Sequence, residues 1–111
     1  MELEANLKLS LLSELYKNLL TQKQQKMLKD FLDNNLSISE LAVEYNSTRQ
    51  AVNDLLKRTF KTLEEYENKL GLLNKLESIK KNVSDSIEEL KKQNLDKKFI
   101  EAKLNEILEV L

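Results

Sequence analysis

The sequence predicts an all-α protein, and the scarcity of turn-forming residues is the first evidence for it. Proline is absent and Gly71 is the single glycine, whereas the tight turns of a sheet usually need one or the other. Long runs rich in leucine, lysine, glutamate, glutamine and asparagine favour helices instead. A length of 111 residues suits one small domain with a helical extension. We expect a helix-turn-helix domain over residues 1–71 and an amphipathic helical tail over residues 72–111.

The first predicted helix runs from Leu3 to Leu20 and is apolar around more than half of its circumference. Its apolar residues are Leu3, Ala5, Leu7, Leu9, Leu11, Leu12, Leu15, Tyr16 and Leu19. An ordinary surface helix has a narrower apolar stripe. We therefore expect cover from more than one side, by the rest of the domain, by the tail or by a second subunit. The protein is accordingly predicted to form a homodimer.

The second predicted helix runs from Gln22 to about Asp33, and Thr21 can cap its first turn. One side of this helix is apolar, with Met27, Leu28, Phe31 and Leu32. The helix should break at residues 33–35, an Asp-Asn-Asn run, because these short polar side chains compete with the helical backbone for hydrogen bonds.

A helix-turn-helix is predicted from Leu36 to Lys61. Ser37 and Glu40 have the spacing of a capping box, in which each side chain accepts a hydrogen bond from the other residue's amide. The box opens a short helix that directs three apolar residues inward: Ile38, Leu41 and Ala42. A short capped helix of this kind is the first half of the motif.

Residues 45–47 form the predicted turn, in which Asn46 takes the left-handed conformation that asparagine tolerates. Thr48 then caps the second helix of the motif, which begins at Arg49. The apolar arc of this helix comprises Ala51, Val52, Leu55, Leu56, Thr59, Phe60 and Leu63. The opposite side carries Gln50, Asn53, Asp54, Lys57, Arg58 and Lys61. The two sides separate cleanly, so we expect the polar one to face water.

The predicted tail is a pair of amphipathic helices. The first has an apolar stripe only about 80° wide on a helical wheel, made of Leu72, Leu76, Ile79, Val83, Ile87 and Leu90. A stripe this narrow suits contact with one partner helix. Residues 93–95 form a turn, and Asp96 caps a last helix whose apolar side is Ile100, Leu104, Ile107, Leu108 and Leu111. The pair either folds back on the domain or serves as a dimerisation arm.

The composition excludes several classes of function. There is no cysteine and no histidine, which removes disulfides, thiolate chemistry, imidazole catalysis and an ordinary zinc site. We therefore expect no enzyme, no catalytic residues, no cofactor and no metal. No run approaches about 18 apolar residues, and the amino-terminal segment is acidic where a signal peptide is basic. The protein is expected in the cytoplasm, without membrane insertion.

The candidate site is the outer side of the second helix of the motif. Although the chain has a net charge of −1, residues 21–61 hold seven Lys/Arg against five Asp/Glu. In DNA-binding versions of the motif, residues near the start of this helix contact base edges and later basic residues contact phosphates. The base-reading candidates are Arg49, Gln50 and Asn53, and the phosphate-binding candidates are Lys57, Arg58 and Lys61. The alternative is that these side chains only solvate a surface helix.

Two segments carry a resemblance to a known family. The run LSISELAVEYNSTRQAVNDLLKRTFKTLEEYENKLGL, with LLSELYKNLLTQKQ upstream, resembles the YlxM-like family of small bacterial proteins. That family is similar to the fourth region of sigma factors, which reads promoter −35 elements. The resemblance covers Met1 to about Leu73. It implies a regulatory or accessory role in the signal recognition particle pathway, because such proteins are typically encoded beside genes of the particle's GTPase.

The resemblance can be carried over residue by residue. Residues 39–42 match the first helix of the family motif, residues 48–52 match the opening of its recognition helix, and Lys57 and Arg58 match its basic pair. Asn46 stands where the family usually has a turn glycine, and Ser47 replaces an apolar residue that would hold the turn to the core. The second departure predicts a looser motif.

Two functions follow as hypotheses. One is a regulator that binds DNA or structured RNA through the polar side of the second helix. The other is an adaptor that binds the signal recognition particle's GTPase or its RNA–protein complex without specific DNA binding. The near-neutral net charge favours the adaptor, whereas the composition of the recognition helix favours the regulator.

Overall fold

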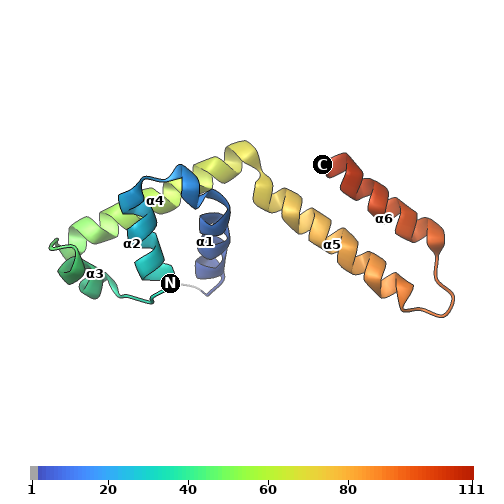
Figure 1. Ribbon diagram of the computed structural model, residues 1–111, viewed down its shortest axis with the longest axis horizontal. Coiled ribbons are helices and arrows are strands. Elements are labelled where there is room, and N and C mark those ends of the chain that lie inside the picture. The colour runs from blue at the N-terminus through green and yellow to red at the C-terminus, as the bar shows by residue number, and fades with distance from the viewer. Residues whose placement is uncertain (1–2) are drawn as a thin grey trace. The chain divides into compact units, whose positions relative to one another are not determined.

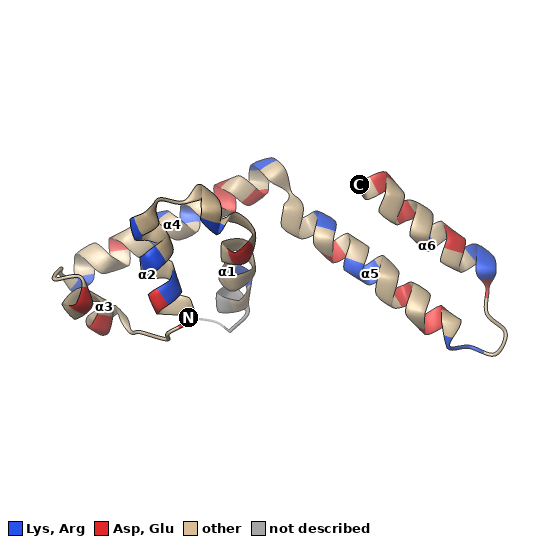
Figure 2. Cartoon of the chain, viewed as in Figure 1, with Lys and Arg blue, Asp and Glu red and all other residues tan. Residues whose placement is uncertain are grey.

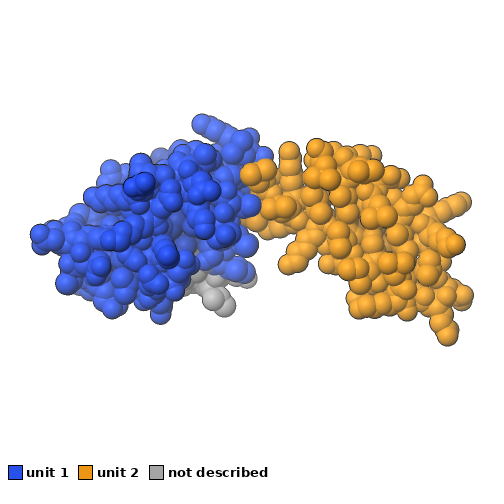
Figure 3. All heavy atoms as spheres, viewed as in Figure 1, with its two compact units in different colours: residues 1–70 blue, residues 71–111 orange. Residues whose placement is uncertain are grey.

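The computed structural model describes residues 3–111, with side chains from Leu7 onward, and every regular element in that range is helical (Figure 1). The elements are α1 (Leu3–Tyr16), the 3₁₀ turn η1 (Lys17–Leu19), α2 (Gln22–Leu32), α3 (Ile38–Glu44), α4 (Arg49–Leu70), α5 (Leu72–Leu90) and α6 (Lys97–Val110). The all-α prediction is confirmed. The chain divides into two compact units, residues 1–70 and 71–111 (Figure 3).

Helix α1 ends at Tyr16, earlier than predicted, because the next turn tightens into the 3₁₀ geometry of η1. The amide of Leu20 donates to the carbonyl of Lys17 at 3.0 Å and closes this turn. Of the predicted apolar arc, Leu9, Leu12 and Tyr16 are buried, whereas Leu7, Leu11 and Leu19 are exposed. The side chains of Leu3 and Ala5 lie outside the described ones. Within the first unit, the apolar arc of α1 is therefore buried along one side and exposed along the other.

Helix α2 begins with a capping box. The Gln24 amide donates to Thr21 Oγ1 at 3.2 Å, and the Thr21 amide donates to Gln24 Oε1 at 3.0 Å, so two otherwise unpaired amides are satisfied. The predicted break follows, and Asn35 has a left-handed φ of 55°. This reversal brings the chain back for α3.

The helix-turn-helix forms with the predicted caps. The Glu40 amide donates to Ser37 Oγ and the Ser37 amide to Glu40 Oε1, both at 3.1 Å. Asn46 takes the left-handed conformation, with φ of 49°. The Ala51 amide donates to Thr48 Oγ1 at 3.0 Å and starts α4. These three predictions are confirmed.

The turn is closed by backbone hydrogen bonds. The Asn46 amide donates to the Val43 carbonyl at 3.1 Å, and the Ser47 amide donates to the Ala42 carbonyl at 2.8 Å. Ser47 is exposed, as its polar side chain permits. The backbone thus holds the turn against α3 without an apolar side chain at position 47.

The core of the motif lies where α2, α3 and α4 cross. Its buried members are Met27, Leu41, Ala42, Val52 and Leu56. Leu36, Phe31, Phe60 and three further half-buried residues pack around them. The placement of Ala51 in this apolar arc is wrong, because Ala51 is exposed and borders an open cavity.

The second unit is an antiparallel hairpin of α5 and α6 (Figure 1). Asp96 caps α6, as predicted, by accepting from the Phe99 amide at 3.1 Å. The predicted stripe of α5 is not the side that α6 covers, because five of its six residues are 40% or more exposed. The buried residues of α5 are instead Leu73, Asn82, Ser86 and Glu89. An apolar stripe shows which side of a helix avoids water, but not which neighbour covers it.

Across residues 3–111, no helix is long and apolar enough to cross a membrane. Among the same residues, no group of three or more Asp or Glu side chains is placed to hold a metal ion.

Candidate nucleic-acid interface

The outer side of α4 carries a stripe of polar residues opposite the core. Gln50, Lys57 and Lys61 are seven and four residues apart and are all exposed, as the helical repeat requires for one side of a helix. Val52 and Leu56 lie on the other side and are buried. The amphipathic pattern of α4 therefore presents these three predicted site residues to water together.

Arg49 and Asn53 lie away from that stripe. Arg49 is exposed beside α3 and lines a shallow hollow of about 490 Å³ with Val43 and Asn46. Asn53 is half-buried, so the expectation that it lies fully in water is only partly met. The three predicted base-reading residues thus spread over one end of α4 instead of forming a single row.

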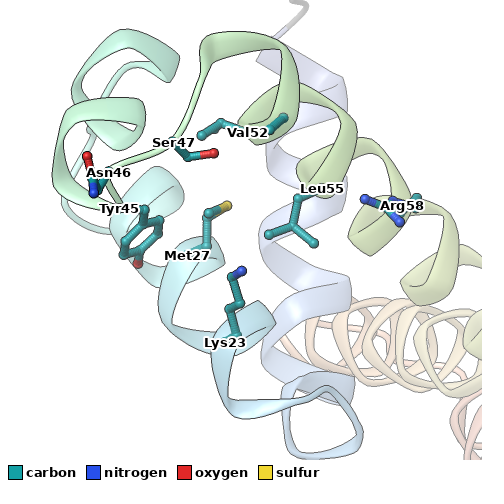
Figure 4. Close-up of a pocket in the computed structure, with 9 residues that line it drawn as sticks. Lys23, Met27, Tyr45, Asn46, Ser47, Val52, Leu55 and Arg58 are labelled. Carbon is teal, nitrogen blue, oxygen red and sulfur yellow. The ribbon is translucent and has the colours of Figure 1, made fainter.

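Arg58 lies on the side of α4 toward α2, where it lines a cavity of about 360 Å³ (Figure 4). Met27, Val52 and Leu55 give the cavity apolar walls. Lys23 reaches into this region from α2, toward Met27 and Leu55 in Figure 4. The cavity therefore combines an apolar interior with two cations from different helices.

Lys23 is a candidate that sequence reasoning missed. The available signal was the repeat of lysine every third residue in the second helix, at positions 23, 26 and 29. Figure 2 shows the resulting distribution, with Lys and Arg on α2 and α4 and acidic residues on α3. The basic residues of α2 and α4 belong to the same unit. A helical wheel drawn for α4 alone could not show that lysines of α2 lie near it.

Lys23 on α2 and the basic residues 57, 58 and 61 of α4 form no ion pair with a described carboxylate, whereas Lys26 and Lys29 interact electrostatically with Asp30. Among the described side chains of the first unit, the single ion pair is Lys17 with Glu14, at 3.5 Å. Asp54 has the helical spacing to pair with Lys57 or Arg58, yet neither pair forms. Lys23, Lys57, Arg58 and Lys61 thus keep their charges available to an external anion.

A partly buried hydrogen bond joins the turn of the motif to α2. Tyr45 Oη donates to Asp30 Oδ2 at 2.7 Å, and Asn34 Nδ2 donates to Asp30 Oδ1 at 2.9 Å. The Tyr45 bond lowers the pKa of the Asp30 carboxyl below its usual value. Burial, followed by the same bond, raises the pKa of the Tyr45 hydroxyl. Both groups therefore keep their neutral-pH protonation states, and Lys26 Nζ lies 5.4 Å from the Tyr45 ring centroid.

Comparison with known proteins gives a family for this architecture. The sequence matches the family described as "UPF0122: Putative helix-turn-helix protein, YlxM / p13 like" over residues 3–107. A UPF0122 protein of Clostridium acetobutylicum is 43% identical over 98 residues, which cover 86% of this chain and 84% of that protein. One of Halalkalibacterium halodurans is 38% identical over 109 residues, covering 98% and 95%. One of Desulforamulus reducens is 44% identical over 80 residues, covering 72% and 68%. The similarity extends beyond Leu73, through most of the tail.

Proposed function

This chain belongs to the UPF0122 family of YlxM / p13-like helix-turn-helix proteins, and we propose that it is a cytoplasmic regulator that binds nucleic acid through α4. The observation that supports the proposal is the absence of ion pairs at four basic residues among the described side chains, Lys23 on α2 and Lys57, Arg58 and Lys61 on α4. Lysine and arginine side chains that only solvate a helix are free to pair with carboxylates three or four residues away. Here Lys57 and Arg58 do not pair with Asp54, although the helical spacing allows it, and this favours an anionic ligand.

The proposed roles of the site residues, base contacts for some and phosphate contacts for others, follow from their positions along α4. Arg49 and Gln50, in the first turn of α4, are at the end that reads base edges in helix-turn-helix proteins. Arginine pairs with guanine, and glutamine or asparagine with adenine. Lys57, Lys61 and Arg58 follow along the helix and would hold phosphates, with Lys23 added from α2. Asn53, being half-buried, contributes less to base reading than the other two.

The proposal is tested by fluorescence anisotropy with a labelled promoter-like duplex and with a structured RNA. The double variant Arg49→Glu/Lys57→Glu should abolish binding, because it replaces two attractions with two repulsions. Lys69→Glu is the control for a single charge reversal on α4, to be compared with Lys57→Glu alone, since Lys69 is exposed at the far end of the same helix. Wild-type protein that binds no duplex and no structured RNA in a salt-dependent manner would refute the proposal, as would equal losses in the test and control variants.

A second candidate function is favoured by a separate observation. A cavity of about 860 Å³ lies between α1 and α2, lined by Leu11, Leu28 and Leu32 and by polar side chains around them. A groove with apolar walls and a polar rim is a common way to receive a helix of another protein. Under this reading the protein is an adaptor, and the family resemblance suggests the GTPase or the RNA–protein complex of the signal recognition particle.

The adaptor hypothesis is tested by measuring binding to purified components of the signal recognition particle. Leu11→Glu should weaken binding to the recombinant GTPase or reconstituted particle of the same bacterium at least tenfold. Val43→Glu is the control, because Val43 is 83% exposed on α3 and outside the groove. If wild-type protein binds neither component, or if both variants bind like the wild type, this candidate loses its support.

A further inference from the structure

The hairpin of α5 and α6 carries an uncovered apolar surface, which we call the apolar hairpin face. Each of its residues is between 41% and 84% exposed. On a helical wheel, the residues of each helix lie about a quarter turn from the side that meets the other helix. Because the helices are antiparallel, the two stripes lie on the same side of the hairpin. The face consists of Leu76, Val83, Ile87, Leu90, Leu104, Leu108 and Leu111.

The side of α5 that is buried within the hairpin is, by contrast, largely polar. Asn82, Ser86 and Glu89 are buried residues of α5, and no residue of α6, all of which is described, is buried. Ser86 Oγ donates to the Asn82 carbonyl at 2.8 Å, and Glu89 accepts from the Asp96 amide at 2.9 Å. The first bond lies within α5 and the second joins α5 to the cap of α6, so neither buries apolar surface. Leu73 is the one buried apolar residue of α5, and the hairpin therefore has little hydrophobic core of its own.

A unit of this size needs support from outside itself. Residues 71–111 approach the length below which chains usually fold with the help of disulfides, metals or association. The protein has no cysteine, which removes the first of these. The seven uncovered apolar side chains point to association.

We propose that the apolar hairpin face binds the same face of a second copy of this chain, so that the two hairpins form a four-helix bundle. The partner that covers this face must be present whenever the chain is folded, and a second copy of the chain meets this condition. A two-fold interface uses one patch on both partners. All seven residues of the face are uncharged, so pairing it with itself brings no like charges together at its centre.

The available area is sufficient for a dimer. The exposed fractions of the seven residues together equal about four whole side chains, and burying one large aliphatic side chain removes about 100 Å² of apolar surface. Two copies would then bury about 800 Å² of apolar surface, or roughly 1,200 Å² in all, because about 65% of a homodimer interface is apolar. Stable specific interfaces begin near this size. The half-buried Ile79, Ile100 and Ile107 add to it.

The test is the oligomeric state of the full chain without nucleic acid, measured by sedimentation equilibrium from 1 to 100 µM. Wild-type protein should have twice the chain mass in the upper part of this range. Ile87→Glu and Leu104→Glu should each raise the dissociation constant at least tenfold. Ala102→Glu introduces the same charge at an exposed position about 160° from Leu104 on α6, and should stay within twofold of the wild type.

A second measurement separates a lost interface from a lost fold. Both Ile87 and Leu104 are about half exposed in the single chain, so glutamate at either position should leave the helical content at 100 µM unchanged by circular dichroism. The melting temperature of the hairpin should rise with concentration in the wild type and not in Leu104→Glu. A wild-type monomer at 100 µM, or a dimer that both glutamate variants leave intact, would overturn the proposal. Since no nucleic acid is used, this outcome is independent of the proposed function.

Discussion

Replacing Leu41 with alanine should remove a large part of the stability of the helix-turn-helix unit. Leu41 is 0% exposed and lies in the cluster where α2, α3 and α4 cross. Truncating a buried leucine to alanine typically costs about 2–5 kcal/mol, since transfer and cavity terms add. A unit of 70 residues has a total stability of about 4–10 kcal/mol. A loss near 3 kcal/mol therefore removes between about 30% and 75% of it.

The loss can be measured by urea denaturation read by tyrosine fluorescence. The protein has three tyrosines and no tryptophan, and Tyr16, Tyr45 and Tyr66 all lie in the first unit, so the signal reports that unit alone. With a denaturant slope of about 1 kcal/mol per molar, the midpoint should fall by about 3 M. Val43→Ala is the matched control, because Val43 is 83% exposed on the same helix; it should change the free energy of unfolding by less than about 0.5 kcal/mol. A loss below about 1 kcal/mol in Leu41→Ala, or equal losses in both variants, would refute the assignment of this core.

Three further predictions concern the cap of α4, the left-handed turn before it and the hydrogen bond between Tyr45 and Asp30. Thr48→Ala should cost about 1 kcal/mol of unfolding free energy in the urea assay, because it removes the bond from the Ala51 amide, whereas Thr48→Ser should cost little; equal costs would argue against the cap. Asn46→Val should cost about 1–2 kcal/mol, since φ is 49° there, whereas Asn46→Gly should be nearly neutral; a tolerated valine would contradict the left-handed turn. Tyr45→Phe removes the bond that lowers the pKa of Asp30 below its ordinary 3.8. A lowered carboxyl pKa gives stability that is present above the unfolded pKa and lost as pH falls through the folded one. The cost of Tyr45→Phe should therefore be about 1–3 kcal/mol at pH 7 and shrink toward pH 2.5, and a difference that is constant with pH would count against this bond.

Local signals in the sequence were enough to predict the helix-turn-helix. Capping geometry depends on residues two or three positions apart, so Ser37 and Thr48 could be assigned without knowing the rest of the fold. The same holds for Asn46, whose left-handed conformation reflects the steric freedom of one residue type. These are features that the chain determines within a single turn of helix.

Features that depend on distant residues were harder to predict. The helical wheel of α5 predicted an apolar stripe but left its partner helix open, and the residues that the hairpin buries include the polar Asn82 and Ser86. The place of Lys23 in the candidate site could not be predicted, because Arg58, which lines the same cavity, is 35 residues away in the sequence. Ala51 was placed in the core by its wheel position, although the space beside it is an open cavity. In each case, the missing information was the identity of the packing neighbour.

The most direct test of the central claim, that the cations of α4 together with Lys23 of α2 bind nucleic acid, is the salt dependence of duplex binding by the wild-type chain. If Lys23, Lys57, Arg58 and Lys61 each contact one phosphate, the logarithm of affinity should fall with the logarithm of salt concentration with a slope of about −3.6. Affinity should then drop about 150-fold between 50 and 200 mM salt. Lys57→Gln should reduce the magnitude of the slope by about one. Binding that does not change with salt, or no binding at 50 mM salt, would contradict the claim.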